Sequence, residues 1–237
     1  LERDNFFKLE AVIGFWPAAQ ENENEVYVFN EKKKDVITKL NFLRQQKPQG
    51  IRPNFCLADF ISPANEGLND YIGGFAVSAG SSVEEKCIEY EEHNDDYSSI
   101  MLKALADRLA EALAEYVHQL VRKKYWGYAK HEALSNEELI KEKYIGIRPA
   151  PGYPACPDHS EKTKLFRLLN SNDLVNISLT ENFAMYPAAS VSGWYFSHPE
   201  SRYFGVGKIG TDQVESIAKS RKEDVELTKK YLRPNLD

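Results

Sequence analysis

The sequence predicts an α+β fold organised as a single domain. Segments typical of strands and helices are mixed along the chain, and several predicted strands are neighbours in sequence, as in antiparallel sheets. No glycine-rich fingerprint follows any strand, which argues against a doubly wound parallel sheet. The 237 residues, of which 42% are apolar, lie within the size range that one hydrophobic core can serve.

The N-terminal third of the chain predicts a hairpin, a helix and two central strands. Residues 11–16 and 25–29 are rich in β-branched and aromatic side chains on either side of a polar turn, so they predict two paired strands. Residues 35–46 place Val36, Leu40 and Leu43 at helical spacing and predict a short amphipathic helix. Residues 55–61 and 71–77 are largely apolar, which predicts central strands.

The middle of the chain predicts two successive helices. Ser81 and Ser82 stand three residues before Glu84 and Glu85, the spacing of a capping box that opens a helix, and this helix is expected to break near residues 93–96. Residues 97–124 predict a longer helix. Its apolar side chains recur every four residues, at Met101, Leu105, Leu109, Leu113 and Val117.

The C-terminal half predicts further mixed elements. Ser135 and Glu138 form a capping box for a helix that runs to about Lys143. A helix is expected over residues 161–169, with strands near 175–179, 191–196 and 203–209. Two polar segments, residues 211–220 and 223–232, predict peripheral helices.

Composition argues against several functional classes. The net charge of −6 gives no basic footprint for nucleic acid. The three cysteines are odd in number and widely spaced, which fits neither a disulfide framework nor a zinc site and favours a reducing compartment. The five histidines show no metal-binding spacing. No apolar run is long enough to cross a bilayer, so the sequence predicts a cytoplasmic protein that does not contact a membrane.

Residues 148–159 hold four prolines in twelve positions. Each proline fixes φ and removes an N–H, so the segment is expected to be a stiff loop rather than a helix or a central strand. Arg148 can pair with a carboxylate, Gly152 allows close approach to the backbone, and Tyr153 offers an aromatic face. These features suit a small molecule with one acidic group. The alternative is an ordered structural linker, since proline-rich connectors are common.

Together with four other segments, this loop closely resembles the activation domain of cobalamin-dependent methionine synthase. The resemblance extends from about Leu9 to the C-terminus. It implies a single C-shaped domain with a twisted antiparallel sheet flanked by helices, a role in methionine biosynthesis, and S-adenosylmethionine as the ligand. The four other segments are residues 56–60 (CLADF), 70–76 (DYIGGFA), 103–111 (KALADRLAE) and 190–199 (SVSGWYFSHP).

The resemblance also implies which residues bind the ligand. Arg148 would pair with the α-carboxylate, and the backbone from Ala150 to Tyr153 would cradle the nucleoside. Tyr203 and Phe204 would line the sulfonium region, where aromatic faces attract a cation.

The assignments are weaker for three acidic residues, Glu142, Asp107 and Glu111. Glu142 is near the site in the family, although an exposed glutamate at a helix end is an equally good interpretation. Asp107, Glu111 and Glu115 form a row along the long helix, and such rows usually face water. In the family, the matching helix faces the ligand cleft and the cobalamin-bearing partner, so Asp107 and Glu111 are expected to contact that partner domain.

By resemblance, the domain supplies no acid, base or nucleophile. It would hold S-adenosylmethionine so that the methyl group reaches reduced cobalamin on a cobalamin-binding domain of the same polypeptide, and catalysis would be mostly orientation. The electron that reduces cob(II)alamin would come from flavodoxin or a related flavoprotein reductase. Zinc would belong only to other domains of the full-length methyltransferase.

One feature of the family has no counterpart in this sequence. Relatives carry a preceding N-terminal segment with an Asp-Trp-Thr-Pro-Phe-Phe motif whose aspartate also contacts the ligand, and residues 1–7 do not reproduce it. Residues 1–237 are therefore expected to be an activation domain without that segment, taken from a longer polypeptide. Two alternatives stay open: a stand-alone S-adenosylmethionine-binding or interaction module that serves another corrinoid enzyme, and a structural relative that has lost its ligand. The presence of Arg148, Gly152 and Tyr203 argues against the second.

Overall fold

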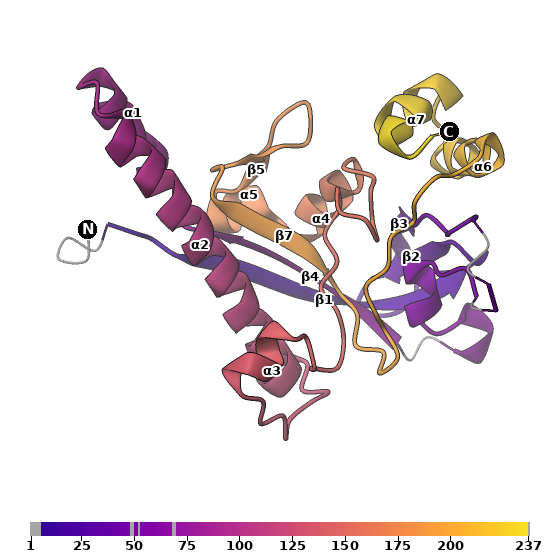
Figure 1. The fold of residues 1–237 in the computed structure, drawn as a ribbon. Helices are drawn as coiled ribbons and strands as arrows, with labels where there is room; N and C mark the ends of the chain where they lie inside the picture. The colour runs from indigo at the N-terminus through magenta and orange to yellow at the C-terminus, as the bar shows by residue number, and fades with distance from the viewer. Residues whose placement is uncertain (1–5, 48–49, 52, 68–69, 237) are drawn as a thin grey trace. The chain divides into compact units, whose positions relative to one another are not determined.

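The computed structural model describes residues 6–47, 50–51, 53–67 and 70–236 (Figure 1). Residues 1–5, on which most of the N-terminal comparison rests, lie outside the described part. The chain folds into two compact units, each built from three separate stretches of sequence. Unit 1 comprises Leu1–Gly14, Gly74–Ala133 and Leu165–Gly193, and unit 2 comprises Phe15–Gly73, Leu134–Lys164 and Trp194–Asp237.

A five-stranded sheet has the order β3-β2-β1-β4-β7. Strands β1 and β2 form an antiparallel hairpin in which Ala18 faces Val28, and β3 adds to β2 antiparallel with Leu40 facing Val26. The strands β1, β4 and β7 each contribute residues to both units. This mixed architecture confirms the α+β class. The strand bounds are β1 Glu10–Glu21, β2 Glu25–Phe29, β3 Val36–Asn41, β4 Asp70–Ser78 and β7 Ser190–Tyr195.

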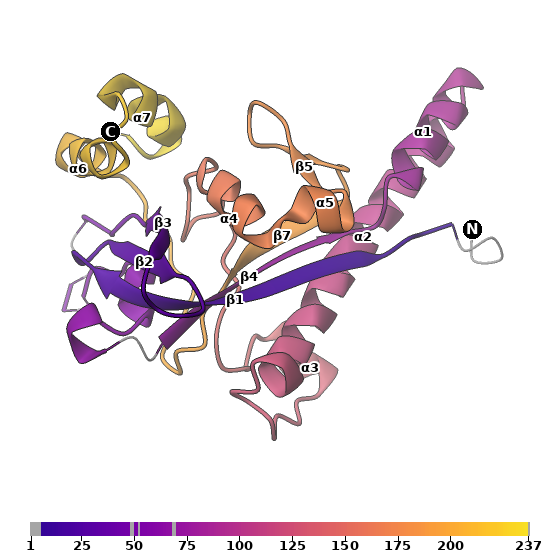
Figure 2. The same cartoon turned by 180° about the vertical axis from the view of Figure 1, so that it is seen from behind.

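Unit 1 is dominated by two helices, α1 (Ser82–Glu92) and α2 (Asp96–Leu120), which lie side by side in Figures 1 and 2. A π-helical turn, Val121–Tyr125, continues α2. In α2, the side chains of Ala106, Ala110 and Ala114 are fully buried. Met101 and Leu105, two of the apolar residues that recur every four positions, are instead 53% and 44% exposed. The unit also contains α5 (Ser171–Val175) and a two-stranded sheet of β5 (Ser178–Leu179) and β6 (Met185–Tyr186).

Unit 2 contains the remaining helices, α3 (Asn136–Ile140), α6 (Thr211–Arg221) and α7 (Val225–Leu232). Helix α4 (Glu161–Leu169) begins in this unit, and its later residues belong to unit 1. Short 3₁₀ turns occur at Leu57–Phe60, Ala64–Glu66 and Arg233–Asn235. The helices α6 and α7 share a buried core with the segment that precedes them and with Leu43, which follows β3. The other members of this core are Val206, Ile209, Val214, Ile217 and Leu232.

Many sequence-based expectations are confirmed. The hairpin, β4, β7, α4, α6 and α7 occur where they were predicted, and the long helix follows a break at residues 93–95. At α3 the capping box is formed, because the Ser135 hydroxyl accepts from the Glu138 N–H and Glu138 accepts from the Ser135 N–H. At α1, Ser81 is the N-cap residue, but its side chain makes no capping hydrogen bond.

Two predictions in the first third of the chain are wrong. The helix expected at residues 35–46 does not form: Val36–Asn41 is strand β3, because the β-branched run from Val36 to Thr38 pairs with β2, and residues 42–46 have no regular secondary structure. The strand expected at residues 55–61 is also absent, and Leu57–Phe60 form a 3₁₀ turn instead. Asp59 accepts the Cys56 N–H at 2.9 Å and closes this turn, so the apolarity reflects burial and not strand pairing.

Two predictions in the last third are also corrected. The strand expected at residues 175–179 is the end of α5 followed by the short β5. Residues 203–209 run without regular secondary structure instead of forming a strand. Their polar backbone groups bond to other loops, for example from the Val206 N–H to the Pro154 carbonyl at 2.9 Å.

Candidate ligand-binding site

The proline loop begins as a short extension of the sheet within unit 2. Ile147 and Phe196 exchange both backbone hydrogen bonds, at 3.0 and 3.1 Å, and the Trp194 N–H donates to the Pro149 carbonyl at 2.9 Å. Pro149 has no N–H with which to return that bond. In this antiparallel register Arg148 lies opposite Tyr195, as a pair without mutual hydrogen bonds. The sheet therefore fixes the backbone of Arg148.

A second contact holds Arg148 from the other side. Its backbone N–H donates to the Tyr203 hydroxyl at 3.0 Å, and the Tyr203 side chain is 40% exposed. Burial raises the pKa of Tyr203, the Arg148 N–H and positive charge act in the opposite direction, and the Glu142 carboxylate raises the pKa further. Arg148 and Glu142 thus both lie within electrostatic reach of Tyr203.

Glu142 follows the C-terminal end of α3 with φ of 51°, in the left-handed region. Glycine usually takes that position after a helix, because a Cβ makes this conformation unfavourable. The chain instead places an exposed carboxylate within electrostatic reach of Tyr203.

Residues 150–156 fold into a tight double turn. The Tyr153 N–H donates to the Ala150 carbonyl at 3.1 Å, and the Gly152 N–H donates to the Cys156 carbonyl at 2.7 Å. The Cys156 N–H donates to the Tyr153 carbonyl at 2.9 Å. Tyr153 itself is 63% exposed. The loop is therefore rigid through its own hydrogen bonds as well as its prolines, and it presents an aromatic ring to solvent.

Gly152 lies directly against His159. Its φ is +101°, and a Cβ at this position would lie 2.2 Å from Cε1 of the imidazole, so only glycine fits. Nδ1 of His159 lies 3.1 Å from the Lys162 ammonium. Burial, and then the Lys162 charge, lower the pKa of His159, which favours a neutral ring that accepts from the ammonium. The sequence indicated Gly152 but gave His159 no role; a glycine seven residues before a histidine carries no recognisable signal.

Phe204 is placed differently from Tyr203. Its ring lies 5.9 Å from the Phe55 ring and 6.5 Å from the Phe60 ring, and it packs against the core formed with α6 and α7. Phe204 is only partly buried, so it both packs in this cluster and keeps some accessible surface.

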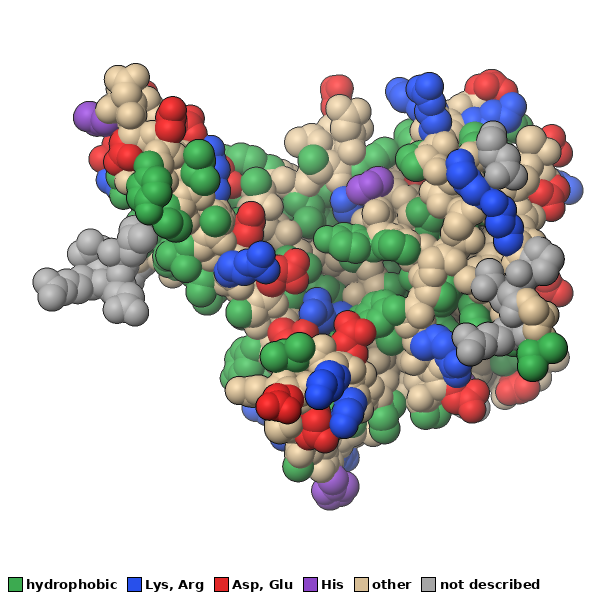
Figure 3. Space-filling model, viewed as in Figure 1, with side chains coloured by type: hydrophobic (Ala, Val, Ile, Leu, Met, Phe, Trp, Pro, Cys, Tyr) green, Lys and Arg blue, Asp and Glu red, His purple; other side chains and the backbone are tan. Residues whose placement is uncertain are grey.

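The predicted partner contacts Asp107 and Glu111 belong to unit 1. Both are exposed on α2 and line a hollow of about 260 Å³ with Arg108, Ala110, Ser190 and Val191. Acidic and basic side chains are mixed over the face shown in Figure 3. The role of Asp107 and Glu111 stays a prediction.

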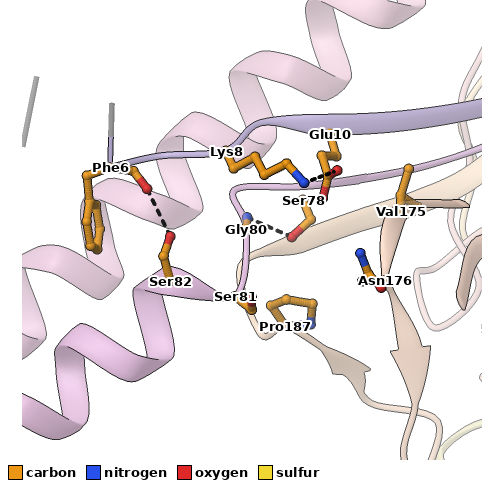
Figure 4. Close-up of a pocket in the computed structure, with 10 residues that line it drawn as sticks. All are labelled: Phe6, Lys8, Glu10, Ser78, Gly80, Ser81, Ser82, Val175, Asn176 and Pro187. Atoms are coloured by element: carbon orange, nitrogen blue, oxygen red, sulfur yellow. Dashed lines mark hydrogen bonds and ion pairs between the residues drawn. The ribbon is translucent and has the colours of Figure 1, made fainter. Parts of the chain in front are cut away.

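A second hollow in unit 1, of about 200 Å³, lies beside the start of α1 (Figure 4). Its polar groups bond to one another: Lys8 pairs with Glu10 at 2.9 Å, the Ser82 hydroxyl donates to the Phe6 carbonyl at 2.9 Å, and the Gly80 N–H donates to Ser78 Oγ at 3.0 Å. The bond from Ser82 to Phe6 joins the first described residue to the start of α1.

The described residues contain no cluster of three or more His, Cys, Asp or Glu side chains arranged to hold a metal ion. Among the helices that the structure describes, none combines the length and apolarity needed to span a membrane.

The fold and the loop define an α+β protein with a rigid proline-rich loop, and comparison with known proteins gives its family. Residues 1–223 match the family model described as the activation domain of vitamin B12 dependent methionine synthase. The chain therefore belongs to this family, as the loop and its companion segments predicted.

A solved structure supports the same conclusion. The chain is similar to the MetH reactivation domain in a crystal structure with bound AdoHcy, with a TM-score of 0.96 and 48% sequence identity. The alignment covers 99% of this chain and 72% of that one. The similarity confirms the predicted fold class.

Proposed function

We propose that residues 1–237 act as an activation domain that binds S-adenosylmethionine through the loop at residues 148–154, Tyr203 and Glu142. In this proposal the chain is the methyl-donor module of a cobalamin-dependent methionine synthase. The observation that carries it is the double hold on Arg148, whose backbone is fixed by β7 on one side and by the Tyr203 hydroxyl on the other. The AdoHcy bound to the similar MetH domain supports the same ligand class.

The chemistry of the described residues fits this ligand. The Arg148 guanidinium can form a bidentate pair with the α-carboxylate, and Glu142 can pair with the α-ammonium. The His159 ring occupies the space beside Gly152, and the hydrogen-bonded turn from Ala150 to Tyr153 can present its backbone to a flat nucleoside. The partly exposed rings of Tyr203 and Phe204 can face a sulfonium.

The reaction that this binding would serve is the reactivation of cobalamin. When bound, S-adenosylmethionine supplies an electrophilic methyl group, which passes to cobalamin after one-electron reduction of cob(II)alamin and leaves S-adenosylhomocysteine. The chain's own residues orient the donor and contribute no proton transfer. A cobalamin-binding domain and a flavodoxin-type electron donor are the partners that this role requires.

The test is calorimetric titration of the 237-residue chain with S-adenosylmethionine and S-adenosylhomocysteine. Arg148→Ala should weaken both by about 1.5–3 kcal/mol, the typical cost of losing a hydrogen bond to a charged group. Arg233→Ala removes an exposed arginine of the same unit and serves as the control, with no expected change.

Three results would count against the proposal. If Arg148→Ala and Arg233→Ala lowered the ligand affinity equally, the effect would not be specific to the loop. Unchanged binding in Arg148→Ala would exclude the carboxylate pairing. Absence of binding to the parent chain would leave the described residues insufficient as a site.

A further inference from the structure

The far end of the proline loop is tied to helix α6 by a buried arginine. Arg221, whose side chain is 4% exposed, donates from Nη2 to Asp158 at 2.6 Å and to Glu161 at 2.7 Å. Its Nη1 also reaches the Ser160 hydroxyl, at 3.2 Å. One guanidinium from the last turn of α6 thus contacts Asp158, Ser160 and Glu161.

Both carboxylates have further partners that fix their orientation. The second oxygen of Asp158 accepts from the Ser160 N–H at 2.8 Å and from the Ser160 hydroxyl at 2.7 Å. The Glu161 oxygen that meets Arg221 also accepts from Lys164 at 2.6 Å. Burial opposes the charge on Arg221, but Glu161 and Asp158 outweigh it and raise the pKa of Arg221. The arginine therefore stays charged in the interior.

This network lies next to the residues that shape the ligand loop. Asp158 directly precedes His159, whose ring closes against Gly152. Glu161 directly precedes Lys162, whose ammonium meets Nδ1 of His159. Holding residues 158 and 161 in place therefore sets the position of the His159 ring from both sides.

Buried ion pairs are weak stabilisers, because desolvation of the charges offsets much of their attraction. Apolar side chains of similar volume often give equal or greater stability, so a buried network is better explained where it fixes a geometry. Here the fixed geometry is that of residues 157–160, an irregular segment that leads from the loop into α4.

We propose that Arg221 is a positioning residue for the ligand loop: it fixes Asp158 and Glu161, and through them the His159 ring that supports Gly152. The proposal rests on the ligand site assigned above. It adds a residue in α6 that was not among the predicted site residues and that does not itself contact the ligand.

The test compares Arg221→Met with Arg122→Met in the 237-residue chain. Arg122 is also buried and bidentate to a carboxylate, but it belongs to unit 1 and its partner is Glu132. S-adenosylhomocysteine affinity should fall about tenfold or more in Arg221→Met, which corresponds to about 1.4 kcal/mol. It should remain within about twofold of the parent in Arg122→Met.

Amide hydrogen exchange supplies a readout that does not need ligand. The Gly152 and Cys156 amides bond within the loop, so both should exchange faster in Arg221→Met and not in Arg122→Met. Parent-like affinity and parent-like exchange in folded Arg221→Met would overturn the proposal. If the parent itself does not bind, the proposed ligand fails, and the exchange comparison still decides whether Arg221 holds the loop.

Arg221→Lys keeps the inference testable if the methionine variant does not fold. Lysine retains the charge but lacks the planar fork that reaches Asp158, Ser160 and Glu161 together. The affinity of Arg221→Lys for S-adenosylhomocysteine should be lower than that of the parent, and its Gly152 and Cys156 amides should exchange faster than those of the parent. Full parent behaviour in Arg221→Lys would mean that charge alone suffices and would overturn the positioning role of the guanidinium.

Discussion

Arg122 in unit 1 and Arg221 in unit 2 are both buried arginines that bind carboxylates, but they join parts of the chain at very different distances in sequence. Arg122 is fully buried and meets both oxygens of Glu132 at 2.8 Å, only ten residues further along. Arg221 meets Asp158 and Glu161, which lie 63 and 60 residues before it.

The difference shows how one chemical pairing can do two structural tasks. The Arg122–Glu132 pair closes the short turn that follows α2, where the Ala129 N–H also bonds to the Arg122 carbonyl at 2.9 Å. Such a local closure costs little chain entropy. The Arg221 pairs close a loop several times longer, and they determine where an irregular segment lies. Local pairing should therefore affect stability alone, and distant pairing should affect the site as well.

Neutralising one carboxylate in each network should give the largest effect. Glu132→Gln leaves Arg122 buried without the counter-charge that it meets now, and should lower the free energy of unfolding by about 3–5 kcal/mol with S-adenosylhomocysteine affinity unchanged. Asp158→Asn should cost less stability, because Glu161 still pairs with Arg221, but it should weaken binding. Urea denaturation and calorimetry measure the two quantities. Equal changes in affinity for the two variants would contradict the view that only the distant pairing of Arg221 affects the site.

A double-mutant cycle at Gly152 and His159 should give an intermediate effect on stability. Gly152→Ala places a methyl group into the imidazole at a left-handed φ, and should destabilise the chain by about 1–3 kcal/mol. His159→Ala removes the steric part of that cost, so the two changes should be less than additive in urea denaturation. Strict additivity would show that the ring does not support the glycine.

The outer end of the loop depends on a neutral hydrogen bond and should give the smallest effect. Tyr203→Phe keeps the aromatic ring but removes the hydroxyl that accepts from the Arg148 N–H, and should lower affinity by about 0.5–1.5 kcal/mol. Tyr97→Phe, at a tyrosine of α2 in unit 1 that is 74% exposed, is the control in the same calorimetric titration. Unchanged affinity in Tyr203→Phe would leave only the ring face as its contribution.

The amino-acid sequence predicted the elements whose signal is local. Capping at Ser135, the helical periodicity of residues 97–120 and the run of prolines all act within a few residues, so they were readable without tertiary structure. The family also followed from the sequence, because its loop and companion segments are long and specific. Local pattern failed at residues 35–46, where pairing with β2 overrides helical spacing.

Tertiary structure alone decided how the site is supported. The sequence offered Arg148, Gly152 and Tyr203 as site residues, but not the hydrogen bond from Arg148 to the Tyr203 hydroxyl across 55 positions. It gave no indication of Arg221, which looks like any basic residue in the last turn of a helix. Its burial beside Asp158 and Glu161 arises because segments about 60 residues apart meet, and a buried charge is stable only where opposite charges meet it.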